Sequence, residues 1–243
     1  MTRYKLILEY LGTNLIGFQR NDGGDSVQSL VEDAIQKFCG ETAIVTACGR
    51  TDAGVHAMNM PTHIDLESGH PAETVKRALN FYLSDSNISV KSCETVPNDW
   101  HARFDCQARH YRYLIDNSDY MPKITRDRAW WIPRPLNIKK MHAAAGDLIG
   151  SHDFTSFRAA ECQAASPIKT LDVADIRIDD NMIIIDFSAK SFLHHQVRNM
   201  VGTLVEIGLN KPLNVRDIFA AQDRSAAGPT APAHGLYFVS ADY

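Results

Sequence analysis

Tyr4-Lys5-Leu6-Ile7-Leu8-Glu9-Tyr10 alternates in the manner of a β-strand with one buried face. A helical pattern follows: it begins at Ser26, continues with apolar residues at i, i+3 and i+4 spacing, and ends at Gly40. The sequence then predicts strands at 43–48 and 60–65, a helix at 71–83 and a strand at 88–95. The order β-α-β-β-α-β is typical of the split-βαβ arrangement, an antiparallel sheet with helices packed on one face.

The second half of the chain repeats this order more loosely. It predicts a strand at 108–115, a helix at 138–148, strands at 170–178 and 182–189, a helix after Phe192, and a last strand at 235–239. We therefore expect an α+β protein made of two ferredoxin-like halves, residues 1–103 and 104–243. No linker-like tract separates them, so the halves are expected to share a mostly antiparallel sheet, with helices on the outer face and a long central groove between them.

Composition restricts the class of protein. The 243 residues are 44% apolar and 22% charged, which is ordinary for a folded globular chain. The N-terminus lacks the pattern of a signal peptide, and no apolar run reaches the roughly 18 to 20 residues that span a bilayer, so we expect a cytoplasmic protein without a membrane partner. The five cysteines are odd in number and contain no Cys-x-x-Cys pair, which argues against both a disulfide framework and a zinc ribbon.

Positive charge is concentrated in one stretch. Residues 101–140 contain nine Lys or Arg against four acids, a net charge of +5, whereas the whole chain carries −4, which leaves −9 for the rest. A basic surface on an otherwise acidic protein fits a partner such as a nucleic acid that binds on one face. Solvated charges on unrelated faces are the alternative.

The densest polar cluster is Gly49-Arg50-Thr51-Asp52-Ala53-Gly54-Val55-His56-Ala57, between two predicted strands. Its glycines allow a tight turn or a close approach of a ligand to the backbone. By residue type alone, the segment favours a surface turn in which Arg50 pairs with a carboxylate.

This nine-residue string resembles the signature of the bacterial tRNA pseudouridine synthase A (TruA) family. Other segments that resemble the family follow in the expected order along nearly the whole chain: Gly17-Phe18-Gln19-Arg20, Asn80-Phe81-Tyr82-Leu83, residues 104–113, Asp153-Phe154-Thr155-Ser156-Phe157, residues 166–170, residues 192–202 and Ala231-Pro232-Ala233-His234-Gly235-Leu236.

The resemblance implies an isomerase that converts uridine to pseudouridine at positions 38 to 40 of the tRNA anticodon stem-loop, in a homodimer and without a cofactor. It implies that Asp52 is the catalytic carboxylate and Tyr111 the ring that stacks on the uracil. Arg198 is implied to pair with Asp52, and Arg50 to contact the RNA and hold the place of the flipped-out nucleotide. Both halves would then be RRM-like. The first half would carry the Asp52 loop, the second half would complete the active site, and the tRNA would bind in the groove between them.

The residue types suit this chemistry. An ionised Asp can attack the sugar or the base, or assist deprotonation, and a neighbouring Arg keeps it charged in a dry pocket. An aromatic ring such as Tyr111 offers a stacking face, although most strand aromatics belong to the core.

The same sequence allows three other interpretations. His194 and His195 suggest a metal site, but adjacent residues on a helix point apart and no Cys or carboxylate stands at a ligand spacing in the sequence, so no metal is expected. A non-catalytic RRM-like RNA-binding protein is the main alternative, and it would not depend on Asp52. A carboxylate-using hydrolase would need a second acid beside the first, and no motif supplies one.

Overall fold

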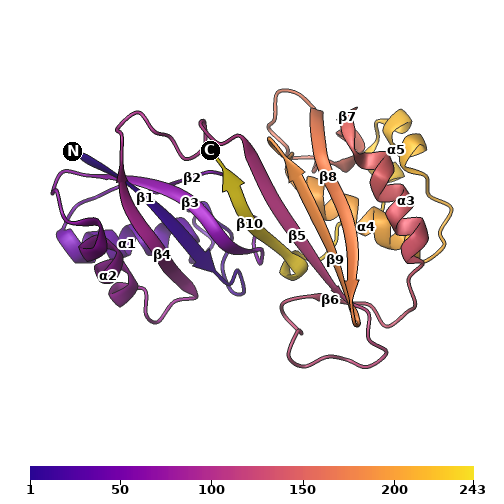
Figure 1. Cartoon of the computed structure of the whole chain (residues 1–243), viewed down its shortest axis with the longest axis horizontal. Coiled ribbons are helices and arrows are strands. Elements are labelled where there is room, and N and C mark those ends of the chain that lie inside the picture. The colour runs from indigo at the N-terminus through magenta and orange to yellow at the C-terminus, as the bar shows by residue number, and fades with distance from the viewer. The chain divides into compact units, whose positions relative to one another are not determined.

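The computed structural model describes all 243 residues as two compact units. Unit 1 contains Met1–Gln107 and Tyr237–Tyr243, and unit 2 contains Ala108–Leu236 (Figure 1). Helices and mostly antiparallel strands alternate in both, as expected for an α+β protein. The division differs from the expected 1–103 and 104–243 in two places. Unit 1 continues to Gln107, and it includes the last seven residues, because Tyr237 and Phe238 pair with His56 and Ala57.

Unit 1 is a sheet of five strands with two helices. Its elements are β1 (Thr2–Tyr10), α1 (Val27–Cys39), β2 (Thr46–Ala47), β3 (His56–Leu66), α2 (Ala72–Tyr82), β4 (Ile88–Val96) and β10 (Leu236–Asp242). Strand β1 lies between β4 and β3 and is antiparallel to both. At one end of β3, Thr46 and Ala47 of β2 pair with His63 and Thr62 in antiparallel fashion, while β10 pairs in parallel with the other end.

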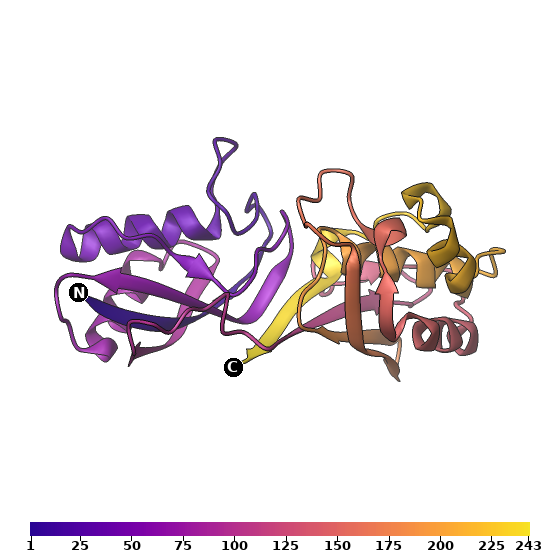
Figure 2. The ribbon, with the colours of Figure 1, turned by 90° about the horizontal axis from the view of Figure 1, so that it is seen from above.

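The core of unit 1 follows from local sequence. Alternate residues of β1 are buried, so this strand turns one side of its apolar alternation inward. Helix α1 begins at Ser26, whose side chain accepts a hydrogen bond from the Ser29 backbone N–H, and ends at Gly40 in the left-handed conformation. The apolar stripe of α1 packs on the sheet and α1 contacts α2; Figure 2 shows α1 lying over one face of the strands.

The strands of unit 2 follow the order β5-β9-β8-β7, with the short β6 parallel to the end of β5. The elements of this unit are β5 (Ala108–Asp116), β6 (Trp130–Trp131), α3 (Ile138–Leu148), β7 (Gly150–Asp153), η1 (Thr155–Phe157), β8 (Ile168–Asp179), β9 (Met182–Ala189), α4 (Gln196–Gly208), α5 (Val215–Ala221), η2 (Arg224–Ala226) and η3 (Ala233–Gly235). Helix α3 contacts both β8 and α4. Nearly every residue of α4 is buried, so this helix forms the centre of the unit.

The long predicted elements are confirmed within a few residues. Strand β3 is longer and β2 shorter than expected, and β6, β7 and α5 were not predicted. None of the helices combines the length and apolar character needed to cross a membrane.

Candidate functional site

Asp52 lies in the loop between β2 and β3 of unit 1. The carboxylate residue is half-buried, and Arg50 in the same loop is exposed. The turn closes where the Val55 N–H donates to the Asp52 carbonyl at 3.1 Å, with Gly54 at φ 80°. This left-handed φ suits the glycine at that position.

The segment that follows β1 holds the Asp52 loop on both sides. On the side before Asp52, the Phe18 N–H donates to the Thr51 carbonyl at 3.0 Å, and the hydroxyls of Tyr10 and Thr51 are hydrogen-bonded at 2.8 Å. On the side after it, the Gly12 N–H donates to Nδ1 of His56 at 2.9 Å. The backbone of Asp52 is therefore fixed from two directions rather than left on a mobile loop.

Two glycines make this approach possible. A Cβ on Gly12 would lie 2.2 Å from the Val55 carbonyl oxygen, and a Cβ on Gly17 would lie 2.8 Å from the Thr51 carbonyl oxygen. Gly17 also has φ +108°, which side chains other than glycine rarely adopt. Any larger residue at either position would displace the loop that carries Asp52.

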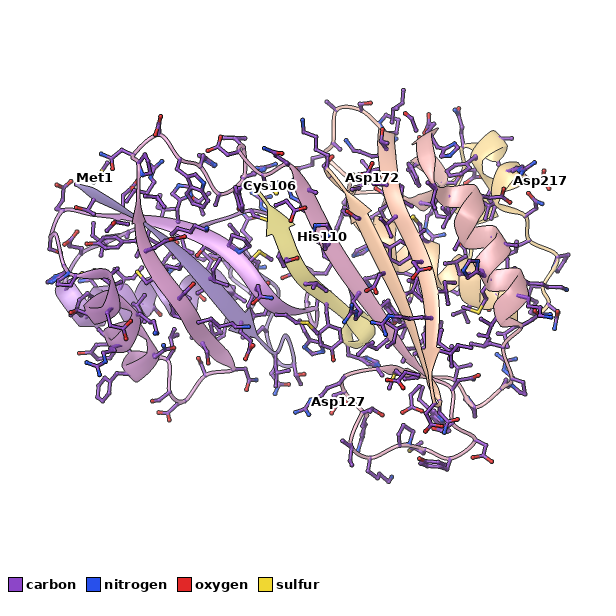
Figure 3. The ribbon with its side chains drawn as sticks, in the orientation of Figure 1. Met1, Cys106, His110, Asp127, Asp172 and Asp217 are labelled. Atoms are coloured by element: carbon purple, nitrogen blue, oxygen red, sulfur yellow. The ribbon has the colours of Figure 1, made fainter.

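Tyr111 lies in the middle of β5 of unit 2, next to His110, which is labelled in Figure 3. It pairs with Phe187 of β9, and its ring meets Phe192 edge-on, with centroids 5.1 Å apart. The residue is only 9% exposed. Its ring is therefore held in a defined orientation by aromatic neighbours.

Arg198 lies in the first turn of α4 and is half-buried. Its Nε donates to the Ala231 carbonyl at 2.8 Å, and the Ala231 N–H donates to the Arg198 carbonyl at 3.1 Å. This reciprocal pair fixes the direction of the guanidinium group.

A buried network behind Arg198 fastens α4 to the segment that contains Ala231. Asn199, fully buried, donates from Nδ2 to the Phe157 carbonyl at 2.8 Å. Its Oδ1 accepts from Arg224 at 3.0 Å and from Thr230 at 2.7 Å. Gly202 completes the contact, because a Cβ there would lie 1.7 Å from the Pro229 carbonyl oxygen.

The structure thus divides the expected site residues between the two units. Arg50 and Asp52 share one loop of unit 1, and Tyr111 and Arg198 belong to the sheet and to α4 of unit 2. The roles of all four, and the pairing of Arg198 with Asp52, remain predictions.

One premise about the histidines was wrong. His194 and His195 do not lie on a helix that points them apart: they precede α4, and His195 has a left-handed φ of 61°. Their rings consequently lie 4.0 Å apart, centroid to centroid.

Sequence reasoning missed the residues that hold the site. Gly17 belongs to a segment that resembles the family, but nothing in the residue pattern pointed to its contact with Thr51. Asn199 and Arg224 meet across 25 residues of chain, and a single sequence contains no signal for such a pair.

The model of the family described as tRNA pseudouridine synthase matches residues 6–105 and 144–243. The chain belongs to this family. The tRNA pseudouridine synthase A of Anaplasma phagocytophilum (strain HZ) is 47% identical over 245 residues, which cover 99% of this chain and 100% of that protein. The protein of the same name from Paramagnetospirillum magneticum (strain ATCC 700264 / AMB-1) is 46% identical, with 100% of this chain and 96% of that protein covered.

Among solved structures, a chain described under "Crystal Structure of a Cbf5-Nop10-Gar1 Complex" aligns with 97% of this chain and 48% of its own length. The TM-score is 0.41 and the identity 10%, so this likeness adds nothing to the family assignment. The resemblance to tRNA pseudouridine synthase A is confirmed by the family match and by the two bacterial relatives.

Proposed function

We propose that this pseudouridine synthase isomerises uridine at positions 38 to 40 of the tRNA anticodon stem-loop, as a cytoplasmic homodimer, with Asp52 as its catalytic carboxylate. The observation that carries the proposal is the rigid Asp52 loop, in which Gly12 and Gly17 let the chain after β1 close on both flanks of the residue. The two relatives that match over nearly their full lengths are each called tRNA pseudouridine synthase A, which supports the same substrate.

The reaction is an isomerisation, so its atoms balance without a cofactor. The bond from C1′ of the ribose to N1 of uracil breaks, the base turns over, and a new bond joins C1′ to C5. The hydrogen leaves C5, and N1 gains one. A carboxylate can serve by attacking the sugar or the base, or by assisting removal of the C5 proton.

Rigid placement matters for such a step. Reacting groups held about 3 to 3.5 Å apart in the correct orientation avoid much of the entropic cost of a bimolecular encounter. The hydrogen bonds to Thr51 and His56 on either side of Asp52 supply this kind of pre-organisation.

Three further residues take supporting roles in the proposal. Arg198 pairs with Asp52 and keeps it ionised, Tyr111 stacks on the target uracil, and Arg50 contacts the RNA in place of the flipped-out nucleotide. The bond from Nε of Arg198 to Ala231 supports a fixed direction for its charge. The exposure of Arg50 supports contact with a large substrate.

The strand order also supports the proposed ferredoxin-like design of the halves. In unit 1, the order β4-β1-β3-β2 with helices after β1 and β3 is that of the split-βαβ arrangement. The RNA-binding groove between the halves belongs to the same proposal.

The test is to map pseudouridine on unmodified tRNA by carbodiimide labelling and primer extension. Wild-type protein should create stops at positions 38 to 40, Asp52→Asn should create none while still binding tRNA, and the exposed Asp22→Asn should behave as wild type. Tight tRNA binding without any stops from the wild-type protein would instead favour a non-catalytic RNA-binding protein. Stops elsewhere in the tRNA would refute the proposed positions.

A further inference from the structure

The segment between β5 and β6 projects beyond the end of the unit 2 sheet (Figure 1). Asp116, the last residue of β5, anchors its base: this buried carboxylate accepts hydrogen bonds from the hydroxyls of Ser118 and Thr125, both at 2.6 Å. Burial alone would raise the pKa of Asp116, but the hydrogen bonds from Ser118 and Thr125 lower it below its ordinary value. The anchor is therefore an ionised carboxylate.

Further hydrogen bonds close the segment on its return. Asn117 donates from Nδ2 to the carbonyls of Ile132 at 2.6 Å and Arg134 at 2.9 Å, and the Trp131 indole N–H donates to the Ser118 carbonyl at 3.0 Å. Residues 117–134, which we call the β5–β6 arm, are thus pinned at both ends. An exposed surface held in this way is already ordered before it meets a ligand, so little conformational entropy is lost on binding.

The tip of the arm exposes large apolar side chains between cations. Ile124 is 87% exposed, Tyr120 64% and Met121 53%. Lys123 and Arg126 are exposed on either side of Ile124. The Lys123 ammonium donates to the Met121 sulfur at 3.8 Å, and neither cation forms an ion pair. The whole arm holds four cations (Lys123, Arg126, Arg128, Arg134) and two acids (Asp119, Asp127), a net charge of +2. Asp127 is labelled on this segment in Figure 3.

Two other cations of the basic 101–140 stretch are engaged within the fold. Arg112 is paired with Asp186 at 2.7 Å, and Arg109 donates to the Lys190 carbonyl. The arm holds four of the nine cations of this stretch, and the two at its tip, Lys123 and Arg126, form no ion pair within the fold.

We propose that the β5–β6 arm is a docking site for the phosphate backbone of the tRNA, separate from the nucleotide that reacts. The inference rests on the proposed function for its substrate. Lys123 and Arg126 would neutralise phosphates, while the side chains of Tyr120 and Ile124 would pack on ribose and base edges. A protein partner fits less well, because the centre of a protein interface is depleted of Lys, whereas here Lys123 sits among the apolar residues.

The position of the arm defines what it can affect. Tyr111 and Asp116 lie five residues apart on β5, a regular strand paired with β9, so the base of the arm is about 16 Å along the strand from Tyr111. A base stacked on Tyr111 cannot reach that far. The arm should therefore strengthen binding of RNA that extends beyond the target and leave the chemical step unchanged.

The experiment compares two double variants that each remove two exposed charges. Lys123→Gln with Arg126→Gln changes the arm, and Lys37→Gln with Lys211→Gln changes exposed cations of α1 and of the turn after α4. Dissociation constants for tRNA are measured over a series of salt concentrations. KM and single-turnover rates are measured on whole tRNA and on a stem-loop trimmed to the few base pairs next to the target.

We expect the arm variant to bind whole tRNA roughly tenfold more weakly, with its salt slope reduced by about 2, and to raise KM without changing the single-turnover rate at saturation. The difference from wild type should shrink on the trimmed stem-loop. The control pair should stay within about twofold of wild type on both substrates, since its cations contact no RNA in this proposal.

An arm variant that matches the control pair in affinity and salt slope overturns the proposal. A third variant, Ile124→Asp, tests the alternative occupant. If Ile124→Asp lowers the mass measured by sedimentation and leaves its tRNA affinity unchanged, the arm is a contact between protein chains and not an RNA site. Failure of the proposed function looks different: wild-type protein would then bind tRNA through the arm and form no pseudouridine.

Discussion

Gly202→Ala should destabilise the protein, although alanine is the better helix former. Gly202 lies in α4, and a Cβ there would lie 1.7 Å from the Pro229 carbonyl oxygen, where contacts under 3.0 Å essentially never occur. The chain at Pro229 would have to retreat by more than 1 Å. Gly146 in α3 is the matched control, because a Cβ there would meet nothing within 4 Å.

The retreat has a definite energetic consequence. It strains the reciprocal hydrogen bonds between Arg198 and Ala231 and the bond from the Gly228 N–H to the Thr203 hydroxyl at 2.9 Å. Three such bonds at about 1 kcal/mol each outweigh the gain of about 1 kcal/mol in helix propensity. We expect Gly202→Ala to lower the free energy of unfolding by about 2 kcal/mol, and Gly146→Ala to raise it by about 0.5 to 1 kcal/mol.

Urea unfolding followed by tryptophan fluorescence measures both changes, since Trp130 and Trp131 belong to the same unit as both glycines. Because the displaced chain also holds Arg198, pseudouridine formation by Gly202→Ala should fall as well. A Gly202→Ala protein at least as stable as wild type would refute the packing argument.

Three other changes test separate parts of the structure. Gly17→Ala should lower kcat/KM at least about tenfold with little loss of tRNA affinity, because the added Cβ would press on the Thr51 carbonyl. The control Gly40→Ala should keep wild-type turnover, since its Cβ would have no atom within 4 Å. Asn199→Ala should lower the free energy of unfolding by about 3 kcal/mol in urea, because it removes the three hydrogen bonds of a fully buried side chain, to the Phe157 carbonyl, Arg224 and Thr230. Burial is the main cause that lowers the pKa of His63 to about 4. Between pH 6.5 and pH 4 the unfolded state therefore binds more protons than the folded state, so the free energy of unfolding decreases as the pH falls through this range. His63→Gln should reduce that loss by about 2 kcal/mol in unfolding curves at pH 7 and pH 4.5, and an unchanged pH dependence would refute the assignment.

Local signals explain which elements the sequence predicted. Helix α1 was predictable because Ser26 and Gly40 mark its ends and its apolar stripe is regular. The two-residue strand β6 exists only because Trp130 and Trp131 pair with the end of β5, and no local pattern encodes that contact. The prediction that His194 and His195 lie on a helix failed for the same reason. The left-handed backbone of His195 depends on how α4 begins, and no local pattern encodes it.

The candidate site likewise has one part that a local motif predicts and another part that depends on long-range contacts. Asp52 was found because its nine-residue motif is contiguous and distinctive. The parts that hold it rigid, Gly12 against Val55 and Gly17 against Thr51, come from segments about 35 to 45 residues apart, and only the folded chain reveals them. The Asn199 network behind Arg198 is long-range in the same sense.

The most direct test of the central claim measures tritium release from tRNA labelled at C5 of uridine, because that hydrogen leaves only when the base is rejoined through C5. Asp52→Asn keeps the size of the side chain and removes its charge. We predict a release rate at least about a thousandfold below wild type, with unchanged tRNA affinity and thermal stability. Release by Asp52→Asn at a rate within tenfold of wild type would contradict the assignment of Asp52 as the catalytic carboxylate.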